Sequence, residues 1–93
     1  MQIEPSKRFR VKLEIIFDYI AKDKLLAAKK FKKELFQKIE DIPNFPYKYR
    51  KSFYFDDDNI RDMIFKKYTI VYEVDLESNQ ILILDVFNRD RLD

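Results

Sequence analysis

Arginines, lysines and tyrosines are the residues of this sequence whose types and spacing suit chemistry. The cations of interest are Arg61, Arg89, Arg91, Lys66, Lys67, Lys48, Arg50 and Lys51, and the tyrosines interleaved with them include Tyr49 and Tyr54. Basic groups beside aromatic rings suit phosphate contacts combined with base stacking. They also suit stabilisation of a pentavalent phosphorane in which the 2′-hydroxyl of RNA is the nucleophile.

Arg61 has a second interpretation that the same pattern allows equally well. It stands on an expected strand, where it could pair across the sheet with Asp85 or Glu73 and have only a structural role. Those two carboxylates fall on the sheet face that the site would occupy, and they disfavour a polyanion there. Both interpretations of Arg61 therefore stay open.

Composition excludes several kinds of active site. The 93 residues include no histidine, cysteine or glycine, which rules out His- or Cys-based triads, disulfides and Gly-rich phosphate loops. A metal site would need carboxylates alone, and the three aspartates at 56–58 are interpreted as a turn, so we expect no metal and no cofactor. No apolar run approaches the roughly 18 residues of a membrane span and no signal peptide opens the chain, which favours a soluble cytoplasmic protein that does not enter a membrane.

Charge is divided unevenly along the chain. Residues 1–55 hold 14 Lys/Arg and 7 Asp/Glu, a net charge of +7, whereas residues 56–93 hold 5 and 10, a net charge of −5. The basic half could attract nucleic acid or an acidic protein. A solvated lysine face on a helix explains most of these lysines without any partner.

The elements that must position the candidate residues are strands in the C-terminal third. Residues 60–65, 68–75 and 80–87 are rich in β-branched and aromatic side chains and predict three consecutive strands. Alternation gives each strand an apolar face, made of Tyr68, Ile70, Tyr72, Val74, Leu82, Leu84 and Val86, and a mixed face, made of Thr69, Val71, Glu73, Asp75, Ile81, Ile83, Asp85 and Phe87. Arg61 and Arg89 bound the mixed face, which is free to meet solvent or a ligand.

Helices are expected to cover the apolar face. Apolar residues spaced three and four apart predict a helix over 7–22, capped by Ser6, and a second over 24–41, capped by Asp23. Residues 1–5 suggest a short first strand, and Pro43 and Pro46 end the helices before an extended arm over 42–59. The predicted fold is a single α+β domain over 1–93, a two-layer β-α-α-β-β-β arrangement with a helical hairpin packed on an antiparallel sheet.

The first helix carries a second apolar stripe beside the one expected in the core. It consists of Val11, Ile15 and Tyr19. Such a stripe is explained either by burial between two layers, which is the commoner reason, or by docking of a partner. Burial of these side chains in the monomer would exclude the docking interpretation.

Three segments together resemble the toxins of the RelE/ParE superfamily from type II toxin–antitoxin modules. The helical hairpin is generically similar. The more specific segments are the one that holds Arg61-Asp62, Lys66-Lys67 and Tyr68-Thr69-Ile70-Val71-Tyr72 and the one that ends in Val86-Phe87-Asn88-Arg89. The resemblance covers almost the whole chain and implies the same β-α-α-β-β-β fold, an antitoxin that wraps the toxin with a helix, and growth arrest when the toxin is free.

The resemblance implies two kinds of target. RelE-like members cut mRNA on the ribosome without metal, and Arg61 and Arg89 would then be catalytic. Lys48, Arg50, Lys51, Lys66, Lys67 and Arg91 would hold the RNA backbone, Tyr49 or Tyr54 would stack a base, and Val11, Ile15 and Tyr19 would bind the antitoxin. ParE-like members inhibit DNA gyrase without chemistry. We expect mRNA cleavage first, with gyrase inhibition or a member that only binds its antitoxin as the alternatives.

Overall fold

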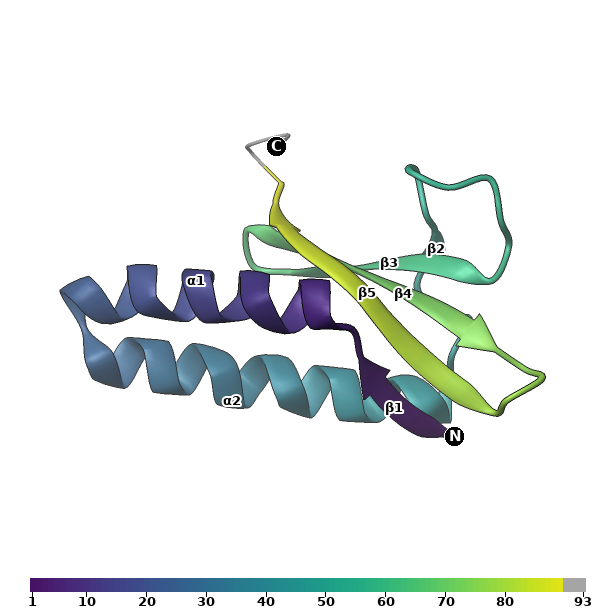
Figure 1. Ribbon diagram of the computed structural model, residues 1–93, viewed down its shortest axis with the longest axis horizontal. Coiled ribbons are helices and arrows are strands. Elements are labelled where there is room, and N and C mark those ends of the chain that lie inside the picture. Colours follow the sequence, from purple (N-terminus) through teal and green to yellow (C-terminus); the bar gives the residue numbers. More distant parts are fainter. Residues whose placement is uncertain (90–93) are drawn as a thin grey trace.

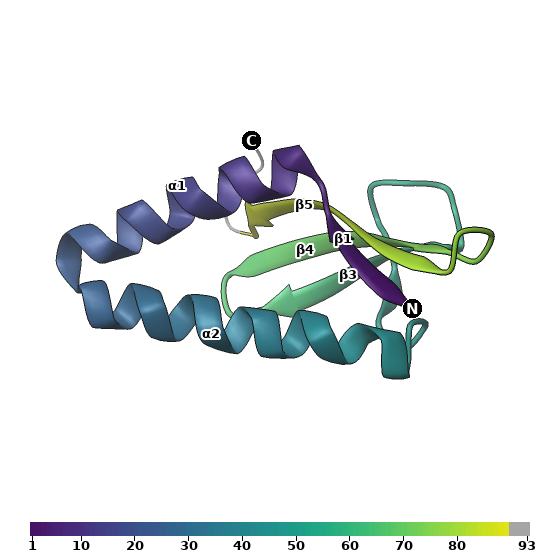
Figure 2. The same cartoon turned by 60° about the horizontal axis from the view of Figure 1, so that its bottom comes forward.

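The elements follow the predicted order with one short strand added. A computed structural model describes residues 1–89, so Arg91 lies outside the described residues. The elements are β1 (Gln2–Pro5), α1 (Lys7–Asp23), α2 (Leu25–Asp41), the short 3-10 helix η1 (Ile42–Asn44), β2 (Arg50–Lys51), β3 (Ile60–Phe65), β4 (Tyr68–Asp75) and β5 (Gln80–Asn88). The two helices form an antiparallel hairpin on one side of the sheet, and their connected end projects beyond it (Figures 1 and 2).

The sheet is mixed, so the prediction of an antiparallel sheet is wrong for one strand. Its order is β1-β5-β4-β3-β2, and β1 pairs in parallel with β5, with Ile3 opposite Ile81. The other strands are antiparallel. The β3–β4 and β4–β5 pairs are joined by short turns, whereas β1 reaches β5 only through the intervening helices and strands, which permits the parallel direction.

The start of α1 is fixed by Ser6. The hydroxyl of Ser6 accepts a hydrogen bond from the backbone N–H of Phe9 at 3.0 Å and donates one to the carbonyl of Leu84 at 3.0 Å. One side chain therefore caps the helix and ties it to β5. The predicted cap at Asp23 is wrong, because α1 includes that residue and α2 begins after Lys24, which makes no side-chain capping bond.

The core lies between the helical hairpin and one face of the sheet. Its fully buried members include Phe9, Leu35, Met63, Ile70, Tyr72, Ile81, Ile83 and Val86. The apolar face predicted on β4 is confirmed, since Ile70, Tyr72 and Val74 all pack in this core. The ring centre of Phe31 on α2 lies 5.4 Å from those of Phe65, to which it is tilted, and Tyr68, which it meets edge-on, and these contacts close the core near the β3–β4 turn.

A β-bulge overturns the face assignment on β5. Val71 pairs with Asp85 while the next residue, Tyr72, pairs with Ile83, so Leu84 is an extra residue on β5. The bulge shifts the alternation by one, which turns Ile81 and Ile83 into the core and leaves Leu82 and Leu84 only half-buried. Asp85 and Phe87, beyond the bulge, lie on the opposite side of the strand from the buried Val86, as predicted, and both contact Lys12 of α1.

Two turns take positive φ without glycine. Lys66 has φ 55° and Asn79 has φ 56°. Both are positions where glycine is the least strained residue, and asparagine tolerates this conformation better than lysine. The sequence contains no glycine, so a lysine and an asparagine take these two positions.

Candidate functional site

Arg61 lies on the helix-covered face, at the base of the arm. It stands opposite Tyr72 in the β3–β4 pairing, so both side chains project from the same side of the sheet. Its Nε donates to the carbonyl of Asp58 at 2.9 Å, its Nη1 donates to the carbonyl of Tyr49 at 3.1 Å, and its guanidinium lies 4.9 Å from the ring centre of Tyr47. Arg61 therefore joins two loops, and it contacts neither Asp85 nor Glu73.

Two tyrosines complete this junction. The hydroxyl of Tyr72 donates to the carbonyl of Pro46 at 2.6 Å, and that of Tyr47 donates to Oδ1 of Asn59 at 2.6 Å. Burial raises the pKa of the Tyr72 phenol far above its ordinary value, against the opposing effect of the nearby Arg61 charge. The phenol is therefore a neutral donor at physiological pH and fixes the arm to the sheet.

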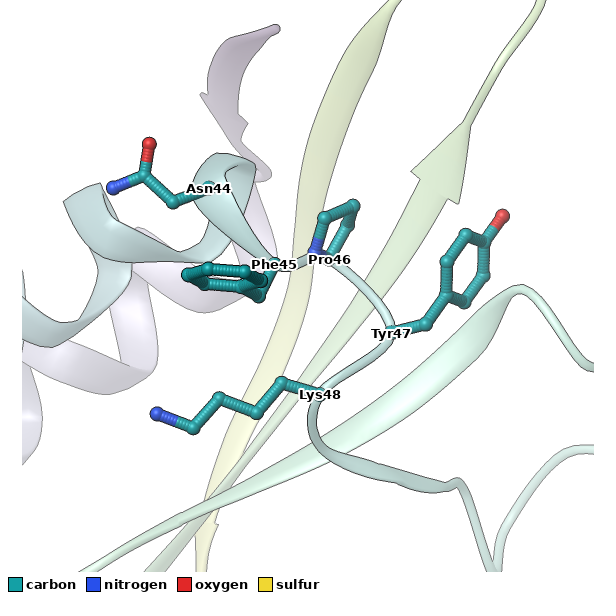
Figure 3. A pocket seen from close by; sticks show the side chains of 5 residues that line it. All are labelled: Asn44, Phe45, Pro46, Tyr47 and Lys48. Atoms are coloured by element: carbon teal, nitrogen blue, oxygen red, sulfur yellow. The ribbon is translucent and has the colours of Figure 1, made fainter.

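A shallow pocket of about 570 Å³ opens beside this junction. It is lined by residues 44–48. Figure 3 shows Phe45 and Lys48 extending to the same side of the segment, while Tyr47 turns away from them. Phe45 is 67% exposed. The pocket is open to solvent and its lining is mostly apolar, and Lys48 is its one cationic side chain.

Arg89 lies at the opposite end of β3 from Arg61. Its Nη1 donates to the carbonyl of Lys66 at 3.3 Å, and its backbone N–H donates to the carbonyl of Lys67 at 2.6 Å. Lys66 lies five positions after Arg61, which corresponds to roughly 16 Å of extended strand. The two arginines are not brought together, and the guanidinium of Arg61 is held beside Asp58 and Tyr49, away from the turn.

The cations of the arm have partners within the protein. A terminal nitrogen of Arg50 lies 3.7 Å from the buried carboxylate of Asp62, and its guanidinium lies over the ring of Phe53 at 4.0 Å. Nζ of Lys51 lies 2.6 Å from Asp58. The hydrogen bond and charge of Asp58 raise the pKa of Lys51, and those of Lys51 lower the pKa of Asp58. Lys48 lies over the ring of Tyr49 at 5.5 Å, so the arm does not present a row of unpaired cations.

The β3–β4 turn carries the other predicted cations. Nζ of Lys66 lies 3.8 Å from Glu34 of α2 and within 6 Å of the rings of Phe31 and Phe65. Lys67 is exposed beside Arg89. Of the two tyrosines predicted to stack bases, Tyr49 is half-buried and packs edge-on against Tyr72, while Tyr54 is 46% exposed and meets Phe87 edge-on at 5.0 Å.

The second stripe of α1 is exposed, so the prediction of burial is wrong. Val11, Ile15 and Tyr19 are 49%, 64% and 69% exposed. The side of α1 that packs in the core instead carries Phe9 and Leu13. Ile15 and Tyr19 line a groove of about 380 Å³ between α1 and the ends of β4 and β5, completed by Lys12, Ile16, Tyr68, Val86, Phe87 and Asn88. These side chains are not buried in the monomer, so the docking interpretation of the stripe stands.

Asp85 connects β5 to α1 beside the groove. Nζ of Lys12 lies 2.7 Å from Oδ1 of Asp85, and Nε of Arg8 donates to Oδ2 at 3.1 Å. Partial burial alone would raise the pKa of Asp85, but the bonds from Lys12 and Arg8 outweigh it and hold that pKa below its usual value. Lys12 also lies 5.7 Å from the ring centre of Phe87.

The role of Asp62, a residue of β3 that anchors the arm, was not predicted from the sequence. Its side chain is fully buried, and Oδ2 accepts the backbone N–H of Phe53 at 3.1 Å. Its other oxygen has no hydrogen-bond partner. An acidic residue inside a strand whose other members are apolar, apart from Arg61, was the available signal, because a buried carboxylate needs a donor from a neighbouring segment.

Residues 1–89 contain neither a cluster of metal-ligating side chains nor a helix suited to cross a membrane. Within residues 1–89, no three side chains from among His, Cys, Asp and Glu are grouped closely enough to hold a metal ion. None of the helices in the same range is long and apolar enough to cross a membrane.

Comparison with known proteins places the chain in a family. No curated protein sequence matches it. The family model described as the ParE toxin of the type II toxin–antitoxin system parDE matches residues 3–93, which is nearly the full length. The two helices packed on a five-stranded mixed sheet are compatible with that assignment. The chain belongs to the ParE toxin family of type II toxin–antitoxin systems, within the RelE/ParE superfamily.

Proposed function

We propose that this toxin acts by binding a protein target, DNA gyrase, and not by cutting RNA. The observation that carries the proposal is the placement of the two candidate catalytic arginines. Arg61 donates to the carbonyls of Asp58 and Tyr49, while Arg89 lies at the other end of β3. Cleavage without metal requires cationic groups that converge on one phosphate, and these two do not converge.

The electrostatics of the arm supports the same proposal. Arg50 and Lys51 have carboxylate partners in Asp62 and Asp58. A phosphate backbone would have to compete with these carboxylates for the two cations, which weakens binding of a polyanion. A protein target bound through surface contacts needs no such exchange.

Cleavage of mRNA on the ribosome is the second candidate. It is favoured by Lys67 and Arg89, which are both exposed and adjoin one another through a backbone hydrogen bond of 2.6 Å. In this case the β3–β4 turn, together with Lys66, would contact RNA, and Arg89 would act on the leaving group. The third possibility is a member that only binds its antitoxin.

Type II membership implies an antitoxin partner, and we propose that it docks in the groove between α1 and β5. The support is the exposure of Ile15 and Tyr19 and the apolar lining from Ile16, Val86 and Phe87. An antitoxin helix that places apolar residues three and four apart in this groove would bury the stripe. Val11, one turn before Ile15, extends the same contact.

The experiment that tests the function is induction of the chain without its partner in bacterial cells, with mRNA 5′ ends and plasmid supercoiling measured in the same culture. Relaxed or cleaved DNA without new 5′ ends supports gyrase inhibition. New codon-positioned 5′ ends that vanish in Arg89→Ala would establish the ribonuclease and overturn the proposal. Neither change, for a chain that still binds the antitoxin in a separate binding assay, would indicate a member that only binds its antitoxin.

A further inference from the structure

The loop between β2 and β3 exposes three consecutive aromatic side chains. Residues 52–59 rise from the sheet on the side away from the helices (Figure 1). Phe53, Tyr54 and Phe55 are 75%, 46% and 47% exposed. Aromatic side chains that stay exposed to water gain no stabilisation from burial. A cluster of them on a protein surface is typical of an interaction site.

This loop is held in place at its base by several hydrogen bonds. The carboxylate of Asp62, fully buried, accepts the N–H of Phe53, and Oγ of Ser52 accepts the N–H of Tyr54. The N–H of Ser52 donates to the carbonyl of Ile60 at 2.8 Å, and Lys51 meets Asp58 across the neck of the loop at 2.6 Å. The aromatic side chains are therefore presented on an ordered backbone, which lowers the entropy lost on binding.

The charge around the aromatic cluster is negative. Arg50 lies against Phe53 and Asp62, and Lys51 is paired with Asp58, so both cations are occupied. Asp56 and Asp57 are exposed, and Oδ1 of Asp57 accepts the N–H of Asn59, two residues later in the same loop. These two carboxylates would repel a phosphate backbone and would attract lysine or arginine side chains.

We infer that the loop 52–59 is the element through which the toxin binds its protein target. Phe53 and Phe55 would enter an apolar cleft on the target, and Asp56 and Asp57 would meet basic side chains at the rim of that cleft. This inference rests on the proposed function and adds to it the contact surface and the chemistry of the partner. The loop is separate from the groove proposed for the antitoxin, and the two surfaces adjoin at Phe87, which lines the groove and contacts Tyr54.

The test uses the full chain and purified DNA gyrase holoenzyme in a supercoiling assay, together with direct binding to immobilised gyrase. The double variant Phe53→Ser/Phe55→Ser should raise the half-inhibitory concentration at least about tenfold, as loss of interface anchors does. Phe45→Ser is the matched control, because Phe45 is a phenylalanine of similar exposure, 67%, outside the loop. The control should change inhibition less than about twofold.

Charge reversal tests the chemistry of the partner. Asp56→Lys/Asp57→Lys should weaken gyrase binding, and raising the salt concentration should weaken binding of the unmodified toxin. Each variant should melt within a few degrees of the unmodified chain and still bind the antitoxin, which shows that it is folded. A charge-reversed toxin that binds as tightly as the original would refute the basic rim.

The outcomes separate this inference from the proposed function. If the unmodified chain inhibits gyrase and the Phe53→Ser/Phe55→Ser variant inhibits equally well, the loop is not the contact surface, although the proposed function stands. If the unmodified chain neither binds nor inhibits gyrase, the proposed function is wrong and the inference falls with it. If the unmodified chain cuts mRNA and the loop variants cut less, the loop is an RNA contact and both are overturned.

Discussion

Lys12 of α1 and Asp85 of β5 form an ion pair at 2.7 Å that joins the first helix to the last strand. The pair lies just beyond the β-bulge at Leu84, where β5 no longer has β1 as a neighbour. α1 takes the place of a neighbouring strand there, and Lys12 covers both the carboxylate and the ring of Phe87. The groove proposed for the antitoxin therefore has a wall whose position depends on this pair.

Loss of the Asp85 carboxylate should change the acid stability of the protein. The pKa of Asp85 is lowered in the folded state, so its contribution is present above the unfolded value near 3.9 and is lost as pH falls through the folded pKa. Asp85→Asn should lower the free energy of unfolding at pH 7 by about 1 kcal/mol and flatten its fall below about pH 4. Urea denaturation between pH 3 and pH 7 measures both effects. If Asp85→Asn left the pH dependence of the free energy of unfolding unchanged, the stabilising role given to the ionised Asp85 carboxylate would be wrong.

Arg61→Ala should act through stability. It removes two hydrogen bonds to carbonyls and the stacking on Tyr47, at a cost of about 1–3 kcal/mol. Arg61→Lys should not restore the lost stability, because a single ammonium group lacks the forked geometry with which the guanidinium reaches both carbonyls. Thermal melting measures the loss, with Arg89→Ala as the control, since Arg89 is exposed and should shift the melting temperature less. An Arg61→Ala toxin that melts normally yet is inactive would instead indicate a role in chemistry.

Tyr72→Phe should separate the arm from the sheet without disturbing the core. It deletes the donor to the Pro46 carbonyl and keeps the buried ring, so it should cost about 1–2 kcal/mol at pH 7. The raised pKa of Tyr72 means that its contribution is complete below about pH 10 and declines above it, as the unfolded phenol ionises first. Guanidinium denaturation at pH 7 and pH 11 should show a smaller difference between variant and parent at pH 11. If the free energies of unfolding of variant and parent differed by the same amount at both pH values, the stabilising role given to the neutral Tyr72 phenol would be wrong.

Ile15→Asp should abolish tight antitoxin binding and leave the fold intact. The side chain is 64% exposed, so stability should change by no more than about 0.5 kcal/mol, while a charge in an apolar groove should weaken binding at least about tenfold. Leu26→Asp is the matched control, because Leu26 is 79% exposed at the far end of the hairpin. Titration of each variant with the antitoxin gives the affinities. Equal affinities for the two variants would place the antitoxin elsewhere.

The helices, the strands and the position of the hydrophobic core between them could be predicted from the sequence. Phe9 and Leu13 are spaced for one side of a helix, Ser6 precedes them with a capping hydroxyl, and Ile70, Tyr72 and Val74 alternate along a strand. Each of these patterns depends on neighbours within a few positions, so the local sequence contains the information. The exposed charge of Lys67 and the apolar stripe of Val11, Ile15 and Tyr19 were visible in the same way.

The tertiary structure alone decided which of these residues meet. The bulge at Leu84 turned Ile83 into the core, and the pairing of β3 with β4 set Arg61 opposite Tyr72, on the covered face. Asp62 found its donor in Phe53, nine residues earlier, through the fold of the arm. Register and loop docking are set by contacts between distant segments, and a shift of one position reverses every face, so periodicity along the chain could not fix them. For that reason the sequence determined the fold and the family, whereas the separation of Arg61 from Arg89 came from the three-dimensional arrangement.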